Sequence, residues 1–193
     1  MAQNNTEIEI KIEVTEKEFK RVKKTLKQIA KYMKESHQVD EYFTPAHRNF
    51  IEPKKPIEWL RIGERGGKII LNYKHFYKNE EGMTTHCDEY ETEVNDKQQL
   101  DFIFKAINMK SLAIVDKTRE TYIYNEKFEI ALDIVKNLGY FIEIEALKHN
   151  ESVEKTRQEL FEIAEKIGID NPKETNKGYP FILMERNSAI KKL

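Results

Sequence analysis

The stretch that decides the fold is E-I-E-I-K-I-E-V, residues 7–14. Its strict alternation places Glu7, Glu9, Lys11 and Glu13 on one face of a β-strand and β-branched residues on the other. Taken alone, this strand fits a sheet edge with a solvated face, because half-exposed antiparallel strands alternate in this way. Carboxylates held in a row on a pleat can instead supply oxygen ligands for a divalent cation. The charges on the other strands have to decide between these interpretations.

Length and charge narrow the classes of protein. The 193 residues predict a single domain over residues 1–193, and the formal net charge of -1 argues against general nucleic-acid binding. The single cysteine, Cys87, can complete neither a disulfide nor a thiolate metal set, so we expect any metal to be oxygen-bound. No apolar run approaches the roughly 20 residues that span a membrane, and the first six residues lack an apolar signal core. We therefore expect a cytoplasmic protein.

Three amphipathic helices are predicted between the strands. A capping box at residues 15–18 opens the first, whose apolar stripe runs from Phe19 to Met33. Asn95 is expected to cap the second, with its inner face running from Leu100 to Ile107. The third carries a stripe over residues 153–167 and is expected to stop at Gly168. Each stripe needs an apolar surface to cover.

Seven further strands are predicted, and their charges segregate by sign. They are expected at residues 40–43, 58–62, 68–76, 84–94, 113–124, 127–135 and 140–147, with Gly66-Gly67 as one hairpin turn. Three of them repeat an acidic face like that of the first strand: Glu89, Glu91 and Glu93; Glu129 and Asp133; Glu143 and Glu145. Other strands carry cations on one face: Arg61, Lys74, Lys117 and Arg119. Like charges are thus grouped within strands and opposite charges between strands.

The helices must cover the apolar strand faces, so the charged faces point away from them. In a flat sheet the charged faces would simply be wet. Eight antiparallel strands can instead curl into a barrel that removes exposed edges. We predict an α+β fold, an eight-stranded antiparallel closed β-barrel with a charged lumen and helices packed outside. Such a lumen suits a polyanion with its divalent cations, because carboxylates bind the metal while Arg and Lys bind phosphate oxygens.

These residues resemble the CYTH superfamily, the triphosphate tunnel metalloenzymes. Glu7-Ile8-Glu9-Ile10-Lys11 matches the ExExK signature, and the later matching segments keep the family's order: residues 60–62, 72–74, 89–93, 117–119, Asp133 and 138–145. The resemblance runs from Glu7 to about Tyr179 and implies an eight-stranded tunnel with helices outside. Residues 40–43 and 117–119 look most like the class IV adenylyl cyclase and thiamine triphosphatase-like branch.

The resemblance also implies roles for individual residues. The implied ligands of a catalytic Mg²⁺ or Mn²⁺ are Glu7, Glu9 and Glu145, supported by Asp133 and Glu143. The implied phosphate ligands are Lys11, Arg61, Lys74, Lys117 and Arg119, of which Lys11 and Lys117 are also candidate catalytic residues. Glu89, Glu91 and Glu93 are candidate counter-ions of the lumen, with a second metal site as the alternative for Glu91 and Glu93. Trp59 is either a stacking platform for a ring at the tunnel mouth or a packing residue.

One departure from the family pattern affects the phosphate ligands. Many members have an arginine two positions after the first, where this chain has Gly63; Arg65 is a possible replacement, but Gly66-Gly67 suggests that the strand ends there. Three functions stay open: conversion of ATP to cyclic AMP and pyrophosphate; hydrolysis of inorganic, thiamine or nucleoside triphosphate; and a non-catalytic triphosphate- or polyphosphate-binding module. The expected binding partner is a triphosphate, and no association with a membrane is expected. A homodimer is a further expectation.

Overall fold

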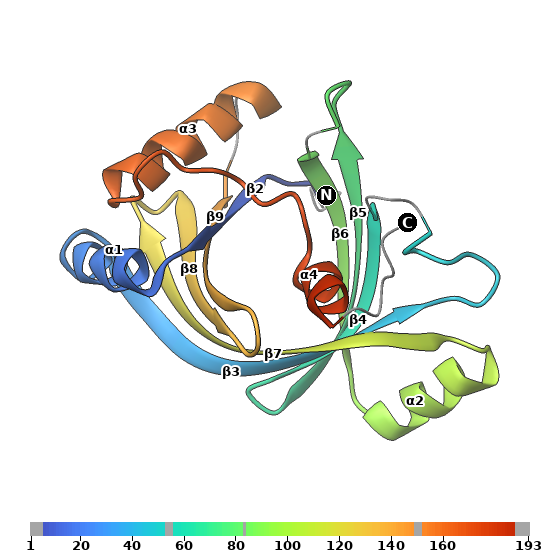
Figure 1. Ribbon diagram of the computed structural model, residues 1–193. Coiled ribbons are helices and arrows are strands. Elements are labelled where there is room, and N and C mark those ends of the chain that lie inside the picture. The colour runs from blue at the N-terminus through green and yellow to red at the C-terminus, as the bar shows by residue number, and fades with distance from the viewer. Residues whose placement is uncertain (1–5, 53–55, 83, 149–151, 188–193) are drawn as a thin grey trace.

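The first strand connects the two ends of the sheet. The computed structural model describes residues 6–52, 56–82, 84–148 and 152–187, and here the strand consists of β1 (Thr6–Glu7) and β2 (Glu9–Val14). β1 pairs with β6 (Thr84–Val94), and β2 pairs with β9 (Gly139–Ala146). The strand order is β1-β6-β5-β4-β3-β7-β8-β9-β2, and all neighbours are antiparallel. Counting β1 and β2 as one strand, eight strands form a strongly curled sheet (Figure 1).

The prediction of a closed barrel was slightly too strong. Among the described residues, two pairs, Thr6 with Asp88 and Glu7 with Cys87, join β1 to β6, so the sheet is a strongly curled half-barrel with a thin seam. The predicted α+β class and the helices outside the sheet are confirmed. The charged face of the first strand lies inside the curl, as the alternation indicated.

The strand predicted at Asp40–Phe43 is the end of a much longer one. β3 (Lys31–Thr44) pairs along its length with β7 (Lys110–Tyr124) and also with β4 (Glu58–Arg65). Residues 31–37 are mostly exposed and show no alternation. Backbone pairing with β7, and not burial of one face, holds them in the strand. The sheet is completed by β5 (Lys68–Lys78) and β8 (Phe128–Val135).

The turn between β4 and β5 forms where two glycines were predicted to form it. Gly66 and Gly67 have φ angles of 59° and 81°, a conformation that suits a two-residue hairpin and that glycine adopts without steric cost. The strand before the turn continues through Arg65.

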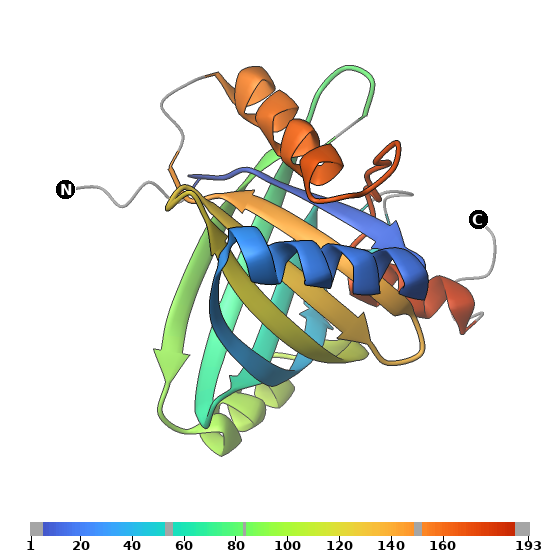
Figure 2. The same cartoon turned by 90° about the vertical axis from the view of Figure 1, so that its left-hand side faces the viewer.

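Two helices cover the outer face of β2, β8 and β9. α1 (Glu16–Ile29) has the predicted capping box at Thr15, and α3 (Val153–Lys166) is followed by Gly168 with a positive φ. Their apolar residues and the isoleucines of the strands form the largest core. Figure 2 shows the two helices lying over these strands. The predicted stripe of α1 was too long, because the chain turns into β3 at Lys31 and leaves Met33 on that strand, 48% exposed.

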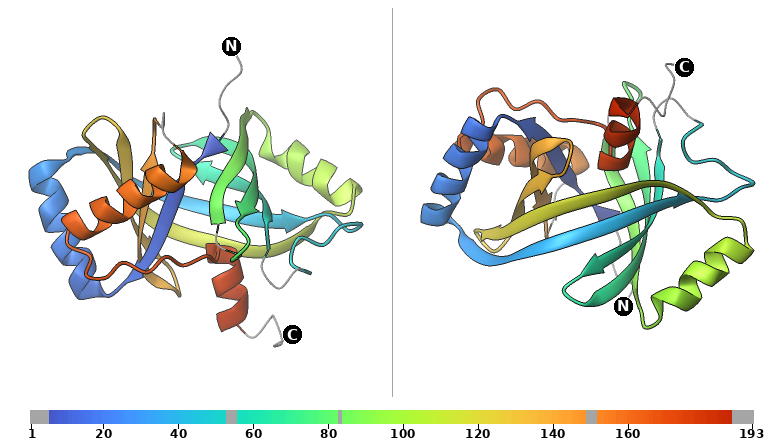
Figure 3. Two further views of the ribbon diagram at one scale, coloured as in Figure 1. Left: turned by 90° about the horizontal axis from the view of Figure 1, so that it is seen from above. Right: turned by 60° about the horizontal axis from the view of Figure 1, so that its bottom comes forward.

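α2 (Lys97–Ala106) lies at the opposite end of the molecule from α1 and α3 (Figure 3). Its cap is Asp96 rather than Asn95, because the Asp96 carboxylate accepts a hydrogen bond from the Gln99 amide. Its buried face was predicted too wide: Phe104 packs on Phe43 and Ile62, while Ile103 and Ile107 are more than half exposed.

The homodimer stays a prediction.

α4 (Tyr179–Arg186) is a helix that the sequence did not reveal. All six residues from Tyr179 to Met184 are buried, so the segment has no amphipathic period to recognise. It packs against Val115, Phe141 and neighbouring residues at the end of the tunnel beside the β8–β9 hairpin (Figure 2). None of the described helices is long and apolar enough to cross a membrane.

Candidate active site

The inner faces of the curled sheet enclose a cavity of about 220 Å³. Six cationic side chains line it: Lys11, Arg61, Arg65, Lys74, Lys117 and Arg119. Seven carboxylates line it too: Glu7, Glu9, Glu89, Glu91, Glu129, Glu143 and Glu145. These residues come from strands that are distant in sequence. Those on β2, β8 and β9 point inward because their neighbours on the strand are apolar and face the helices.

A row of carboxylates crosses three adjacent strands of this cavity. Glu145 on β9 lies directly opposite Glu9 on β2 and directly opposite Glu129 on β8. Side chains in such positions have Cβ atoms roughly 5 Å apart, and like charges placed so are destabilising. In the part of the chain that the structure describes, Glu129 and Glu145 form no ion pair or hydrogen bond. Glu7 lies two residues before Glu9 and extends the row.

Burial and the repulsion between neighbouring carboxylates raise the pKa of two members of this row, Glu145 and Glu7. Burial, together with Glu7 and Glu9, raises the pKa of Glu145 to about 8. Burial also raises the pKa of Glu7 to about 7, with Glu9 and Glu89 adding to the shift and Lys74 opposing it. A divalent cation fits this donor set because it is hard, prefers carboxylate oxygens and would remove the repulsion. Among the described residues no three acidic, histidine or cysteine side chains already converge on one point, so binding would require side-chain adjustment.

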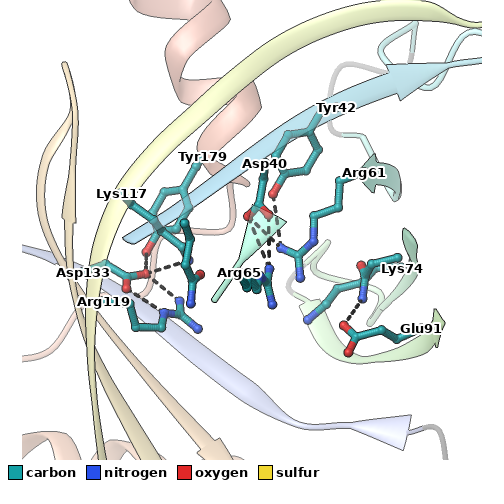
Figure 4. A network of polar contacts seen from close by, with 12 residues as sticks. Asp40, Tyr42, Arg61, Arg65, Lys74, Glu91, Lys117, Arg119, Asp133 and Tyr179 are labelled. Atoms are coloured by element: carbon teal, nitrogen blue, oxygen red, sulfur yellow. Dashed lines mark hydrogen bonds and ion pairs between the residues drawn. The ribbon is translucent and has the colours of Figure 1, made fainter. Parts of the chain in front are cut away.

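Two of the predicted metal ligands have a different environment. Asp133 is fully buried, does not line the cavity, and accepts hydrogen bonds from Lys117 at 3.1 Å, Arg119 Nε at 2.7 Å and the Tyr179 hydroxyl at 2.8 Å (Figure 4). Glu143 is paired with Lys11 at 3.1 Å and with Arg119. The structure therefore groups Glu7, Glu9 and Glu145 with Glu129, and it places Asp133 and Glu143 among the cations.

Glu129 is a member of the acidic row that the sequence-based ligand set omitted. The alternation of residues 127–135 had placed it on the same face as Asp133, so the signal was present. Only the register of β8 with β9 shows that Glu129, and not Asp133, lies beside Glu145.

The five predicted phosphate ligands all reach the same cavity, from β2, β4, β5 and β7. Two of its lysines differ in acid strength. Burial would lower the pKa of Lys11, but Glu143 and Glu9 hold it above its ordinary value. Burial and the adjacent Arg119 lower the pKa of Lys117 to about 8, although Asp133 and Glu143 oppose the change. Lys11 is thus a permanent cation, while Lys117 can lose its proton close to neutral pH.

The three predicted counter-ions on β6 differ in position. Glu89 lies 3.5 Å from Lys74 and 4.0 Å from Arg61, which is the arrangement of a counter-ion. Glu91 accepts a hydrogen bond at 3.2 Å from Asn72, a buried amide that the sequence did not single out. Glu93 is half exposed, pairs with Lys68 at 2.6 Å and is not among the residues that line the cavity.

Aromatic side chains close one side of the cavity. Trp59 is 7% exposed and packs edge-on against Tyr42, with ring centroids 5.7 Å apart, and this contact favours its packing role. Tyr179 was not predicted as a site residue, yet its ring lies 4.4 Å from the Lys11 ammonium and 5.1 Å from that of Lys117. Its place at the start of α4 brings it into the site, and that helix has no amphipathic period by which it could have been predicted.

This chain is similar in sequence or in fold to several known proteins. A Methanocaldococcus jannaschii protein, provisionally named an adenylate cyclase, is 30% identical over 175 residues, which cover 90% of this chain and 95% of that protein. The PH1819 protein of Pyrococcus horikoshii has a TM-score of 0.77 and 27% identity, covering 93% of this chain and 99% of that one. A Hippeastrum protein described as having a dominant triphosphatase activity shares the fold, with a TM-score of 0.65 and 17% identity over 95% of each chain. The CYTH domain family matches residues 5–179, and the chain belongs to this family.

Proposed function

We propose that this protein is a divalent-metal-dependent enzyme that acts on a triphosphate inside its tunnel, and that its reaction is the conversion of ATP to cyclic AMP and pyrophosphate. One observation carries the proposal: a row of carboxylates shares a single cavity with six cations, and two of its members, Glu129 and Glu145, have no cationic partner among the described residues. A site for a metal alone would not need the cations, and a site for an anion alone would not tolerate the carboxylates.

The two sets of residues divide the work. Arg61, Lys74 and Arg119 would hold phosphate oxygens, since charge-assisted hydrogen bonds from arginine and lysine are strong and directional. Glu9, Glu129 and Glu145, with Glu7, would hold Mg²⁺ or Mn²⁺ through carboxylate oxygens. When bound there, the cation would lower the pKa of an attacking hydroxyl and offset charge on the phosphates.

In the cyclase reaction, the ribose 3′-oxygen bonds to the α-phosphorus while the bond to the β-phosphate bridging oxygen breaks. Pyrophosphate leaves, and the hydroxyl proton has to pass to an acceptor. Lys117 suits this role because it lines the cavity and its pKa is lowered to about 8 by burial and Arg119. Lys11, which keeps its charge, would stabilise negative charge that develops on the phosphates.

Hydrolysis of a triphosphate is the second candidate. It is supported by the cavity lining, which is dominated by charged groups, and by Trp59, which packs on Tyr42 and is not presented as a free stacking surface for a base. In that reaction water attacks the terminal phosphorus, and the same residues hold the chain of phosphates. The difference lies in which phosphorus faces the nucleophile.

The test is product analysis with three substrates. Purified protein would be incubated with Mg²⁺ or Mn²⁺ and, separately, with ATP, tripolyphosphate or thiamine triphosphate, and the products separated by ion-exchange chromatography. Cyclic AMP with pyrophosphate supports the cyclase, whereas orthophosphate from tripolyphosphate without cyclic AMP from ATP replaces it with the hydrolase. Tight metal-dependent binding without turnover would overturn both reactions in favour of the binding module.

A further inference from the structure

Gly63 and Asp40 form a matched pair across β3 and β4. The two residues are directly opposite in the register, on the face that points into the tunnel. A Cβ atom placed on Gly63 would lie 2.4 Å from Asp40 Oδ1, a distance at which atoms overlap. The Asp40 carboxylate therefore occupies the space that a side chain at position 63 would need.

This carboxylate binds the two arginines that flank Gly63 on the same strand face. Arg61 Nη1 lies 3.5 Å from Asp40 Oδ2, and Arg65 Nη2 lies 3.3 Å and 3.4 Å from the two carboxylate oxygens (Figure 4). Asp40 is 1% exposed, so it lies behind the arginines, and both arginines line the cavity. Burial would raise the pKa of Asp40, but Arg61, Arg65 and Lys117 hold it below its ordinary value. Asp40 thus stays charged and anchors both side chains.

Arg65 retains an unused donor in this arrangement. Its Nε atom is buried and has no hydrogen-bond partner among the described residues. A buried donor without a partner is costly, and a guanidinium presents its donors in a planar fork suited to phosphate oxygens. The Nε atom would lie 3.5 Å from a Cβ at position 63, so a side chain there would contact the Arg65 guanidinium as well as Asp40.

We propose that Arg65 is a phosphate-binding residue of the tunnel and that Asp40 positions it through the space left by Gly63. The proposal rests on the proposed triphosphate function. It places the phosphate contact at position 65, two residues after Gly63, where this chain has an arginine. It also gives Gly63 a role, because any larger residue there would displace the Asp40 carboxylate and release both arginines.

The test is binding of tripolyphosphate in the presence of Mg²⁺, measured by isothermal titration calorimetry. Arg65→Gln is expected to weaken binding about 10-fold or more, since it removes a charge-assisted contact. Arg65→Lys keeps the charge but not the planar guanidinium, so its Kd is expected to lie between those of the wild type and Arg65→Gln. The matched control is Lys68→Gln, which also removes one positive charge. Lys68 pairs with Arg65 in the register of β4 and β5, but its side chain is exposed and lies outside the cavity. This variant should change Kd less than twofold.

Asp40 and Gly63 are tested for action through Arg65. Asp40→Asn and Gly63→Ala are each expected to weaken binding several-fold, and the effect of Gly63→Ala should shrink in an Arg65→Gln background, because coupled residues are not additive. Binding by the wild type with an unchanged Kd in Arg65→Gln overturns this inference alone. Absence of tripolyphosphate binding by the wild type overturns the proposed function as well. If Arg65→Gln does not fold, judged by thermal unfolding, the folded Arg65→Lys decides: a Kd equal to that of the wild type overturns the role of Arg65.

Discussion

Glu9 and Glu145 lie directly opposite each other across the β2–β9 pair, with Glu129 on the far side of Glu145. Cross-strand pairs usually match opposite charges or apolar groups, and like charges in this position reduce stability. The same curled sheet places cations on β4, β5 and β7, but within the described residues Lys74 is the cation that comes within 4.0 Å of Glu9 and none comes as close to Glu145. This local excess of negative charge is the feature that a bound cation would relieve.

Replacing one member of this row separates function from stability. Glu145→Gln should abolish metal-dependent turnover, because it removes an oxygen ligand, and it should leave the metal-free protein as stable as the wild type or more stable, because it removes a repelling charge. Turnover with Mg²⁺ or Mn²⁺ and thermal unfolding without metal are the measurements. Glu13→Gln is the control, since Glu13 lies on β2 but is exposed and pairs with Arg186 at 2.9 Å. Full activity of Glu145→Gln, or of Glu9→Gln, would remove that residue from the metal site.

The raised carboxyl pKa values predict how stability depends on pH. Burial and neighbouring carboxylates raise the pKa of Glu145 to about 8, and burial raises that of Glu7 to about 7. The folded protein therefore binds more protons than the unfolded chain at neutral pH, so the stability that these two groups contribute is present below about pH 4.5 and is lost as pH rises towards 8. The melting temperature of metal-free protein should fall between pH 5 and 8. Mg²⁺ or Mn²⁺ should reduce that fall, because metal binding favours the deprotonated carboxylates.

A comparison of buffers by differential scanning calorimetry would check this expectation. The pH dependence should flatten in Glu145→Gln. A melting temperature that rises steadily from pH 5 to 8 in the absence of metal would contradict it.

Lys117 is expected to act as a proton acceptor, and its substitution by arginine tests that role. Arginine keeps the positive charge but does not lose its proton, so Lys117→Arg should still bind tripolyphosphate while its rate falls about 100-fold or more. The wild-type rate should rise with pH through about 8, the pKa to which burial and Arg119 bring Lys117. The measurements are kcat against pH and calorimetric binding. A Lys117→Arg variant with the wild-type rate and pH profile would exclude this role.

The hydroxyl of Tyr179 links α4 to the cationic part of the tunnel. It donates a hydrogen bond to Asp133 at 2.8 Å in a buried site, so Tyr179→Phe should reduce the free energy of unfolding by about 1 kcal/mol. Tyr179→Leu also removes the ring that lies 4.4 Å from the Lys11 ammonium and should be more destabilising. Urea unfolding at pH 7 is the measurement.

Tyr77→Phe is the matched control for that pair of variants. The Tyr77 hydroxyl also donates to an aspartate, Asp88, at 2.8 Å, but Tyr77 is 40% exposed and water can replace the bond. An equal loss of stability in Tyr77→Phe and Tyr179→Phe would show that burial of the Asp133 contact has no special weight.

The elements that were predicted well are those with a local period. Strands with alternating charge, the capping box at Thr15 and the turn at Gly66-Gly67 are where the sequence placed them, because side-chain direction and turn conformation depend on neighbouring residues. The long β3 and the helix α4 were predicted too short or not at all. Residues 31–37 are held by pairing with β7, and residues 179–184 are buried on all sides, so neither segment shows a local pattern.

The sequence by itself determined the inward face of Glu7, Glu9 and Lys11, the family resemblance, and the five predicted phosphate ligands, all of which line the cavity. The tertiary structure decided how these charges are shared. Asp133 and Glu129 lie on the same face of β8, yet Asp133 forms ion pairs with Lys117 and Arg119 and accepts a hydrogen bond from Tyr179, while Glu129 lies beside Glu145. The physical reason is that charge pairing in a curled sheet depends on strand register and on contacts between distant segments: Tyr179 and Asp133 are 46 residues apart. A local pattern sets the face on which a residue lies but not the charge that it meets there.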